Sequence, residues 1–178
     1  TNLELIGDAF GHGTRAIADA STDNITIADG TADADRAMYL KLTGGGQACT
    51  VTLLPNTVSK VWMMENGTSA ALTFTQGSGA NVIIPAGDTK LIASDGAGSG
   101  AVVYDVFASL SVVDLNVSGA VDIDGAVQID NTVSVGVNDT GYDVKFFGDT
   151  ASAFMLWDAS ADDLILGGAA GLSVNSAA

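Results

Sequence analysis

Pairs of apolar, strand-forming residues return every six positions near the middle of the chain, over residues 115–135. The two members of each pair are two positions apart, so in an extended strand both side chains lie on one side and the intervening residue lies on the other. A later slot in each repeat holds Gly119, Gly125 or Asn131, residue types that tolerate positive φ, which predicts a tight turn. We call the paired positions the hexad ladder: Leu115 and Val117, Val121 and Ile123, Val127 and Ile129, and Val133 and Val135.

The hexad ladder is too short to bury its own apolar residues. A solenoid needs several stacked repeats before it has an interior. A meander turning at residues 124–125 and 130–131 would have strands of about three residues, shorter than the usual five to six. Copies of the same chain around a threefold axis would provide the missing surface. We therefore interpret residues 111–137 as the β stem of a homotrimer; the alternative is a chance run of valines in an Ala-, Val- and Gly-rich chain.

Residues 24–110 show short apolar stretches at intervals of roughly ten residues, separated by turn signals such as Gly44-Gly45-Gly46 and Asn66-Gly67. This spacing predicts a small β-sandwich or jelly-roll-like domain. Trp62 and Met64 alternate with Met63, so one face of that strand should meet the core and the other a neighbour. Most of the remaining core bulk is expected from Tyr39, Phe74, Tyr104 and Phe107. The predicted strands are 25–28, 37–42, 49–54, 60–65, 71–76, 81–84, 89–94 and 101–107.

The two ends of the chain have different patterns. Gly7, Gly11 and Gly13 interrupt residues 1–23, which are expected to form an irregular connector. Residues 138–178 predict β-hairpins over 142–148, 154–158 and 163–168, in a module that is expected to continue beyond residue 178. Both faces of the middle strand are apolar, so the hairpins are predicted to pack between chains of the trimer. The predicted trimer interface comprises the hexad ladder together with Phe146, Phe154, Leu156 and Trp157.

Composition narrows the class of protein. Gly is abundant at 22 residues, Pro is rare at 2, and no long stripe of period 3.6 is present, so the chain is predicted to be all-β. The net charge is −15, from 21 acidic and 6 basic residues, which argues against binding to nucleic acid or to an anionic membrane surface. No signal peptide is visible, and no apolar run approaches the roughly 20 residues that span a bilayer.

Few residues suggest chemistry. Cys49 lies in a strand pattern, which favours a buried small hydrophobe over a reactive thiol. His12 has no second His and no nearby Cys, so a structural role is favoured over a metal ligand. The alternating Asp residues of 29–35 resemble a calcium-binding loop in composition, but their spacing differs and the bidentate Glu is missing, which favours an acidic surface loop. We expect no catalytic residues, no cofactor and no metal.

Two parts of the chain resemble proteins of bacteriophage particles. The runs GYDVKFFG at 141–148, FMLWD at 154–158 and DDLILG at 162–167 resemble a module that recurs in tail-fibre and other virion proteins, especially those of marine phages. Upstream, residues 49–55, 59–66, 73–79 and 86–103 look like a β domain common in phage tail proteins. The resemblance implies a trimeric, elongated and modular protein of the virion, often serving in host attachment, with other virion proteins as partners.

The leading hypothesis is therefore a segment of a homotrimeric tail fibre or appendage, located in the virion, that spaces or presents host-attachment elements. One alternative is a receptor- or carbohydrate-binding module in which Trp62, Trp157 or Tyr142 contacts a host glycan. Another is a fibre that decorates the capsid. An enzyme that cuts host polysaccharide with two carboxylates about 5 to 9 Å apart is disfavoured, because 21 acidic residues nominate no particular pair.

Overall fold

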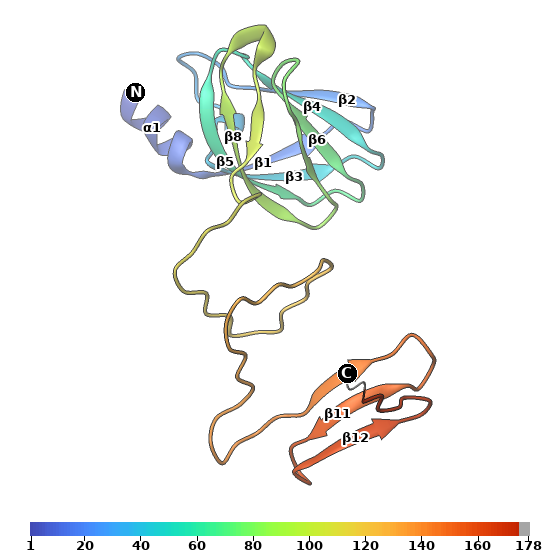
Figure 1. Ribbon diagram of the computed structural model, residues 1–178. Coiled ribbons are helices and arrows are strands. Elements are labelled where there is room, and N and C mark those ends of the chain that lie inside the picture. Colours follow the sequence, from blue (N-terminus) through green and yellow to red (C-terminus); the bar gives the residue numbers. More distant parts are fainter. Residues whose placement is uncertain (175–178) are drawn as a thin grey trace. The chain divides into compact units, whose positions relative to one another are not determined.

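The computed structural model describes residues 1–174, which are mostly β and fall into two compact units (Figure 1). Unit 1 comprises Thr1–Leu115, and unit 2 begins at Asn116. The elements of unit 1 are α1 (Asn2–Phe10), β1 (His12–Ile17), β2 (Thr22–Thr26), η1 (Ala34–Arg36), β3 (Tyr39–Gly44), β4 (Cys49–Leu54), β5 (Ser59–Asn66), β6 (Leu72–Thr75), β7 (Val82–Ile84), β8 (Thr89–Asp95), η2 (Gly98–Gly100) and β9 (Val103–Asp105). Those of unit 2 are β10 (Val144–Phe147), β11 (Phe154–Asp158) and β12 (Asp163–Gly167).

The chain of unit 1 winds back and forth between two mixed sheets. One sheet has the order β1-β3-β5-β8-β9 and the other β2-β4-β6-β7, so successive strands from β1 to β6 alternate between the sheets. Each winding places a new strand parallel to the previous strand of the same sheet, with Leu40 opposite Met64 in one sheet and Val51 opposite Phe74 in the other. The later strands β7, β8 and β9 pair antiparallel. Here the crossover between parallel strands is a strand of the facing sheet, where a helix is more usual.

The two sheets face each other around a single apolar core (Figure 1). Strand β4 alternates strictly, with Cys49, Val51 and Leu53 buried and the residues between them half-buried. In β5, Trp62 and Met64 point into the core and Met63 points outward, which confirms that the two faces differ and shows which of them is buried. Each sheet therefore buries one face, and the core holds the side chains Ile17, Ile25, Leu40, Leu42, Cys49, Val51, Leu53, Trp62, Met64, Leu72, Phe74, Val82, Ile84, Ile92 and Val103.

All eight strands predicted for residues 24–110 are present, displaced by at most a few residues at their ends. The facing sheets agree with the expected sandwich, whereas the parallel pairs differ from the antiparallel order of a jelly roll. The prediction of which aromatic side chains fill the core is only partly correct. Phe74 is buried, but Tyr104 and Phe107 are exposed, because they fall on the outward side of β9 and in the turn after it.

The prediction of an irregular connector over residues 1–23 was wrong. A capping box between Thr1 and Glu4 starts α1, while β1 and β2 each form an edge strand of one sheet. Gly13, interpreted from the sequence as a strand breaker, lies inside β1. A methyl group there would lie 3.2 Å from Leu40 Cδ1 and still closer to the carbonyl of Ala34, so the glycine permits close packing.

The hexad ladder forms no strand within a single chain: in the described residues, the path from β9 to β10 contains one isolated bridge, between Val137 and Thr140 (Figure 1). The hairpin prediction for unit 2 is confirmed, since β10, β11 and β12 form an antiparallel sheet in that order. Lys145 lies opposite Leu156, and Trp157 lies opposite Leu164. Because this sheet has no second layer within the described residues of unit 2, both of its faces are open.

Candidate association surface and polar network

The hexad ladder is exposed along its whole length. Its eight apolar side chains retain between 46% and 71% of their surface in a single chain. Isolated exposed valines are ordinary, but a continuous series of this length is typical of segments that associate with another surface. In the single chain the ladder therefore offers apolar contacts that remain unused.

The strand register of unit 2 places a second group of exposed apolar side chains on one face of its sheet. Met155 and Trp157 point to this face of β11, and their neighbours across the sheet continue it without a polar interruption. We call this surface the apolar face; it consists of Val144, Phe146, Met155, Trp157, Leu164 and Leu166. Apart from the half-buried Val144, these side chains are 39% to 61% exposed. Such a continuous patch on a three-stranded sheet is typical of an interaction surface.

The opposite face of the same sheet is mixed. Phe154 and Leu156 lie there, beside Phe147 and Lys145 from β10. The Lys145 amino group lies 4.0 Å from the centre of the Phe154 ring and 4.9 Å from that of Phe147, an arrangement that favours the cation and partly covers both rings. Of the interface residues predicted in the hairpins, Phe146 and Trp157 thus lie together on the apolar face, and Phe154 and Leu156 lie on the other side.

Sequence reasoning missed part of this surface. Met155, Leu164 and Leu166 were not proposed as interface residues, although each alternates with a neighbour along its strand. The missing information was the pairing register, which decides whether the apolar side of β12 joins the side of β11 that carries Trp157 or the other side. Helix α1 was missed as well, and its Leu3, Ile6 and Phe10 form an exposed stripe in unit 1.

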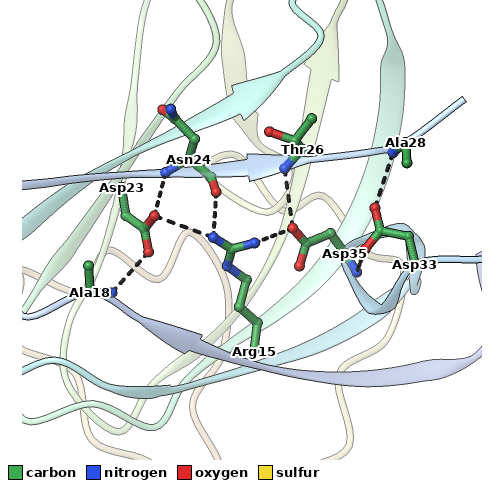
Figure 2. A network of polar contacts seen from close by, with 8 residues as sticks. All are labelled: Arg15, Ala18, Asp23, Asn24, Thr26, Ala28, Asp33 and Asp35. Carbon is green, nitrogen blue, oxygen red and sulfur yellow. Dashed lines mark hydrogen bonds and ion pairs between the residues drawn. The ribbon is translucent and has the colours of Figure 1, made fainter.

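An ion network joins the edge strands of the two sheets in unit 1 (Figure 2). The guanidinium of Arg15, on β1, pairs with Asp35 through Nη1 and with Asp23 on β2 through Nη2, at 3.3 Å. The same Nη2 donates to the Asn24 carbonyl at 2.6 Å. Since β1 and β2 are edge strands of different sheets, the contacts of Arg15 connect the two sheets at these edges.

The pKa values of the two carboxylates of this network are shifted in opposite directions. Burial raises the pKa of Asp35, against the opposing effects of the Arg15 charge and the Thr26 amide. Burial also acts to raise the pKa of Asp23, but hydrogen bonds from the amides of Ala18 and Asn24, together with Arg15, outweigh it and leave the pKa below its ordinary value. The network therefore contributes to the stability of unit 1 with a dependence on pH.

Asp23 gives this pH dependence a definite sign. Its folded-state pKa lies below the unfolded value of about 3.9, so its contribution is present above that pH and is lost as pH falls through the folded-state pKa. Asp23→Asn should therefore cost about 1 to 2 kcal/mol of unfolding free energy at pH 7. The difference from the native chain should shrink towards pH 3, as urea unfolding at both pH values would measure.

Asp114→Asn is the matched control, because Asp114 carries the same charge but is exposed. It should change the unfolding free energy by less than about 0.5 kcal/mol at either pH. An Asp23→Asn cost that stays constant between the two pH values would contradict an ionic role for Asp23.

The acidic segment 29–35 has internal partners. Asp33 accepts hydrogen bonds from the amides of Ala28, at 3.1 Å, and Asp35, at 2.9 Å, while Asp35 accepts from Thr26 and Arg15 (Figure 2). Within residues 1–174, no three His, Cys, Asp or Glu side chains gather closely enough to hold a metal ion. The alternating carboxylates of Asp33 and Asp35 thus fix the loop to β2 and to η1.

The structure revises the candidate glycan contacts. Trp62 was a candidate, but it is only 1% exposed and forms part of the core, so this assignment was wrong; the alternation of β5 places it inside. Trp157 and Tyr142 are exposed. Cys49 is buried as predicted, and burial raises the pKa of its thiol. His12 stacks on Tyr39 with ring centres 5.1 Å apart.

In the part of the chain that the structure describes, no helix has the length and apolar character needed to cross a bilayer. Comparisons with protein families, with curated proteins and with solved structures give no match to this chain.

Proposed function

We propose that this chain is a structural component of a virus particle: a segment of a homotrimeric fibre or appendage that spaces or presents host-attachment elements. The observation that carries the proposal is the exposed apolar surface beyond β9, formed by the hexad ladder and the apolar face of unit 2. The resemblance of residues 141–167 to phage virion proteins supports the same proposal.

Burial of apolar surface favours association through these segments. Burial of one Val, Leu or Ile side chain contributes about 1.5 to 3 kcal/mol, so covering the eight residues of the ladder would supply a large favourable free energy that offsets part of the cost of ordering the segment. Unit 2 buries little apolar surface of its own; among its described residues Ala153 is the buried hydrophobic one. We infer that the ladder and the sheet of unit 2 are completed by other copies of the chain.

A threefold arrangement suits the short strand pairs of the ladder. In a closed ring each chain covers one neighbour and is covered by the other, so no strand edge is left unpaired. The polar residues between the paired apolar positions then face water, as the alternation of each hexad requires. At −15 per chain, a trimer would carry roughly three times that charge, which keeps the assembled particles soluble and apart.

The place of the chain in a virus particle is tested by localisation. An antibody raised against the purified chain should label intact particles of the virus that encodes it, at the tail or at another appendage. Detection of the chain only in infected-cell lysate, with purified particles free of label and of its tryptic peptides, would contradict the proposal.

A further inference from the structure

A pocket of about 430 Å³ lies in unit 1 beside the end of β2 and the beginning of β5. Its apolar wall consists of Ile27, Pro55 and Val58, and the basic residues Arg36 and Lys60 also line it. A concave site with an apolar wall and a few convergent polar groups is the usual form of a small-molecule site.

The two basic residues of this pocket differ from the other basic residues of unit 1. Among the described residues, neither Arg36 nor Lys60 forms an ion pair, in a chain with 21 acidic residues. The remaining basic residues of unit 1 are paired with carboxylates: Arg15 with Asp23 and Asp35, Lys41 with Glu65, and Lys90 with Asp105. Within unit 1, the lack of a carboxylate partner is therefore specific to the two basic residues of the pocket.

The hydrogen bonds of Arg36 leave part of its guanidinium available. Its Nη2 donates to the carbonyls of Ala28 and Thr31, which hold the side chain in place without neutralising it. Its Nη1 donates no side-chain hydrogen bond among the described residues, whereas its Nε is buried and out of reach of a bound molecule. A fixed guanidinium with unused donors is a preorganised site for a carboxylate or phosphate group.

Lys60 lies near enough to Arg36 to be affected by its charge. Burial, and secondarily the Arg36 charge, lower the pKa of Lys60. The Lys60 amino group lies 5.3 Å from the centre of the Trp62 ring. An anion bound between the two cations would relieve their repulsion, and partial burial would strengthen the attraction.

Asp29 is the acidic residue that lines the same pocket. It is exposed, and it forms no ion pair with either cation in the part of the chain that the structure describes. Its charge is therefore screened by water and does not neutralise the site. It should nevertheless weaken binding of an anion, so a variant that removes the Asp29 charge should bind the anion more tightly.

We propose that this pocket binds a small molecule that carries a carboxylate or phosphate group, with the anionic group between Arg36 and Lys60 and the body of the molecule against Ile27, Pro55 and Val58. This inference concerns the folded unit 1 and does not depend on the proposed trimer. The carboxylate of an acidic sugar and a phosphate group share the required chemistry.

Isothermal titration calorimetry on the full chain at low salt tests the site. Glucuronate or inorganic phosphate should bind saturably, with a dissociation constant of about 1 mM or below, and neutral glucose should not. Binding of glucuronate alone would identify a carboxylate site, and binding of phosphate alone a phosphate site. Absence of saturable binding for both anions at about 10 mM would overturn the proposal.

Matched variants separate this pocket from general charge effects. Lys60→Gln should weaken anion binding at least about tenfold, because it removes one of the two cations. Lys90→Gln removes the same charge from unit 1 outside the pocket and should change the affinity less than about twofold. Asp29→Asn should tighten binding about two- to threefold. Equal losses of anion affinity in Lys60→Gln and Lys90→Gln, with circular dichroism showing that both variants are folded, would mean that the loss follows from net charge alone. This result would contradict the proposed site.

Discussion

Replacing Val127 and Ile129 with Asp should convert the trimer that we propose into monomers while unit 1 stays folded. The change places two carboxylates per chain at positions that we infer to be buried between copies, and desolvation of an unpaired charge costs several kcal/mol each. It also removes two apolar contacts of about 1.5 to 3 kcal/mol per chain. Sedimentation velocity would report the loss of the trimer, and far-ultraviolet circular dichroism the retained sheets of unit 1.

The matched control adds the same charges to the same segment at polar positions. Gln128 and Ser134 lie between the paired apolar residues, so Gln128→Asp with Ser134→Asp should leave the trimer intact. If both double variants stay trimeric, association depends on other surfaces, such as the apolar face of unit 2, and the stem interpretation fails. If both dissociate, the effect comes from added charge and not from the ladder.

Trp62→Ala should cause the largest loss of stability in unit 1. Trp62 is among the largest fully buried side chains, and truncation of a buried aromatic residue costs about 3 to 5 kcal/mol. Its indole Nε1 is buried without a hydrogen-bond partner in residues 1–174, so removing the ring also removes an unsatisfied polar group, and we expect the lower part of that range. Urea unfolding followed by circular dichroism would measure the change.

Met63→Ala is the control for this prediction, because Met63 is adjacent on β5 but points outward and is 39% exposed. It should cost less than about 1 kcal/mol. Comparable losses for the two variants would contradict the placement of Trp62 in the core. A loss of glycan binding in Trp62→Ala without loss of stability would contradict it too, and would restore the original assignment of Trp62 as a glycan contact.

The sequence predicted strands β2 to β9 of unit 1 well because their signals are local, whereas β1 was missed. Alternation in β4 and β5 places Val51 and Trp62 on the opposite face from their neighbours along the strand without knowledge of the fold, but in β5 it does not decide which face is buried. Turn residues between the strands mark their ends. What local signals do not contain is the pairing partner, so the parallel windings of the two sheets were not predicted.

The parts that could not be predicted depend on contacts between distant residues. Gly13 reads locally as an interruption, whereas its function in β1 is to permit the approach of Ala34 and Leu40. Asp35 reads as part of an acidic loop, but it pairs with Arg15, which is 20 positions away in the sequence. For the same reason, the apolar face of unit 2 appears only when Trp157 is placed opposite Leu164.

In the hexad ladder, a clear pattern in the sequence has no counterpart in the structure of the single chain. Its periodicity is clear in the sequence, yet no strand forms there among the described residues, and the apolar residues remain exposed. A regular apolar pattern without a partner in its own chain favours a partner in another chain. The proposed function therefore depends on assembly of several copies of the chain more than on any feature of the isolated chain.

Sedimentation equilibrium of the native 178-residue chain tests that dependence most directly. The chain has a mass of 17.8 kDa, so the account predicts a single species of about three times this mass, persisting on dilution to micromolar concentration. A well-folded species with the mass of one chain at the same concentration would contradict it.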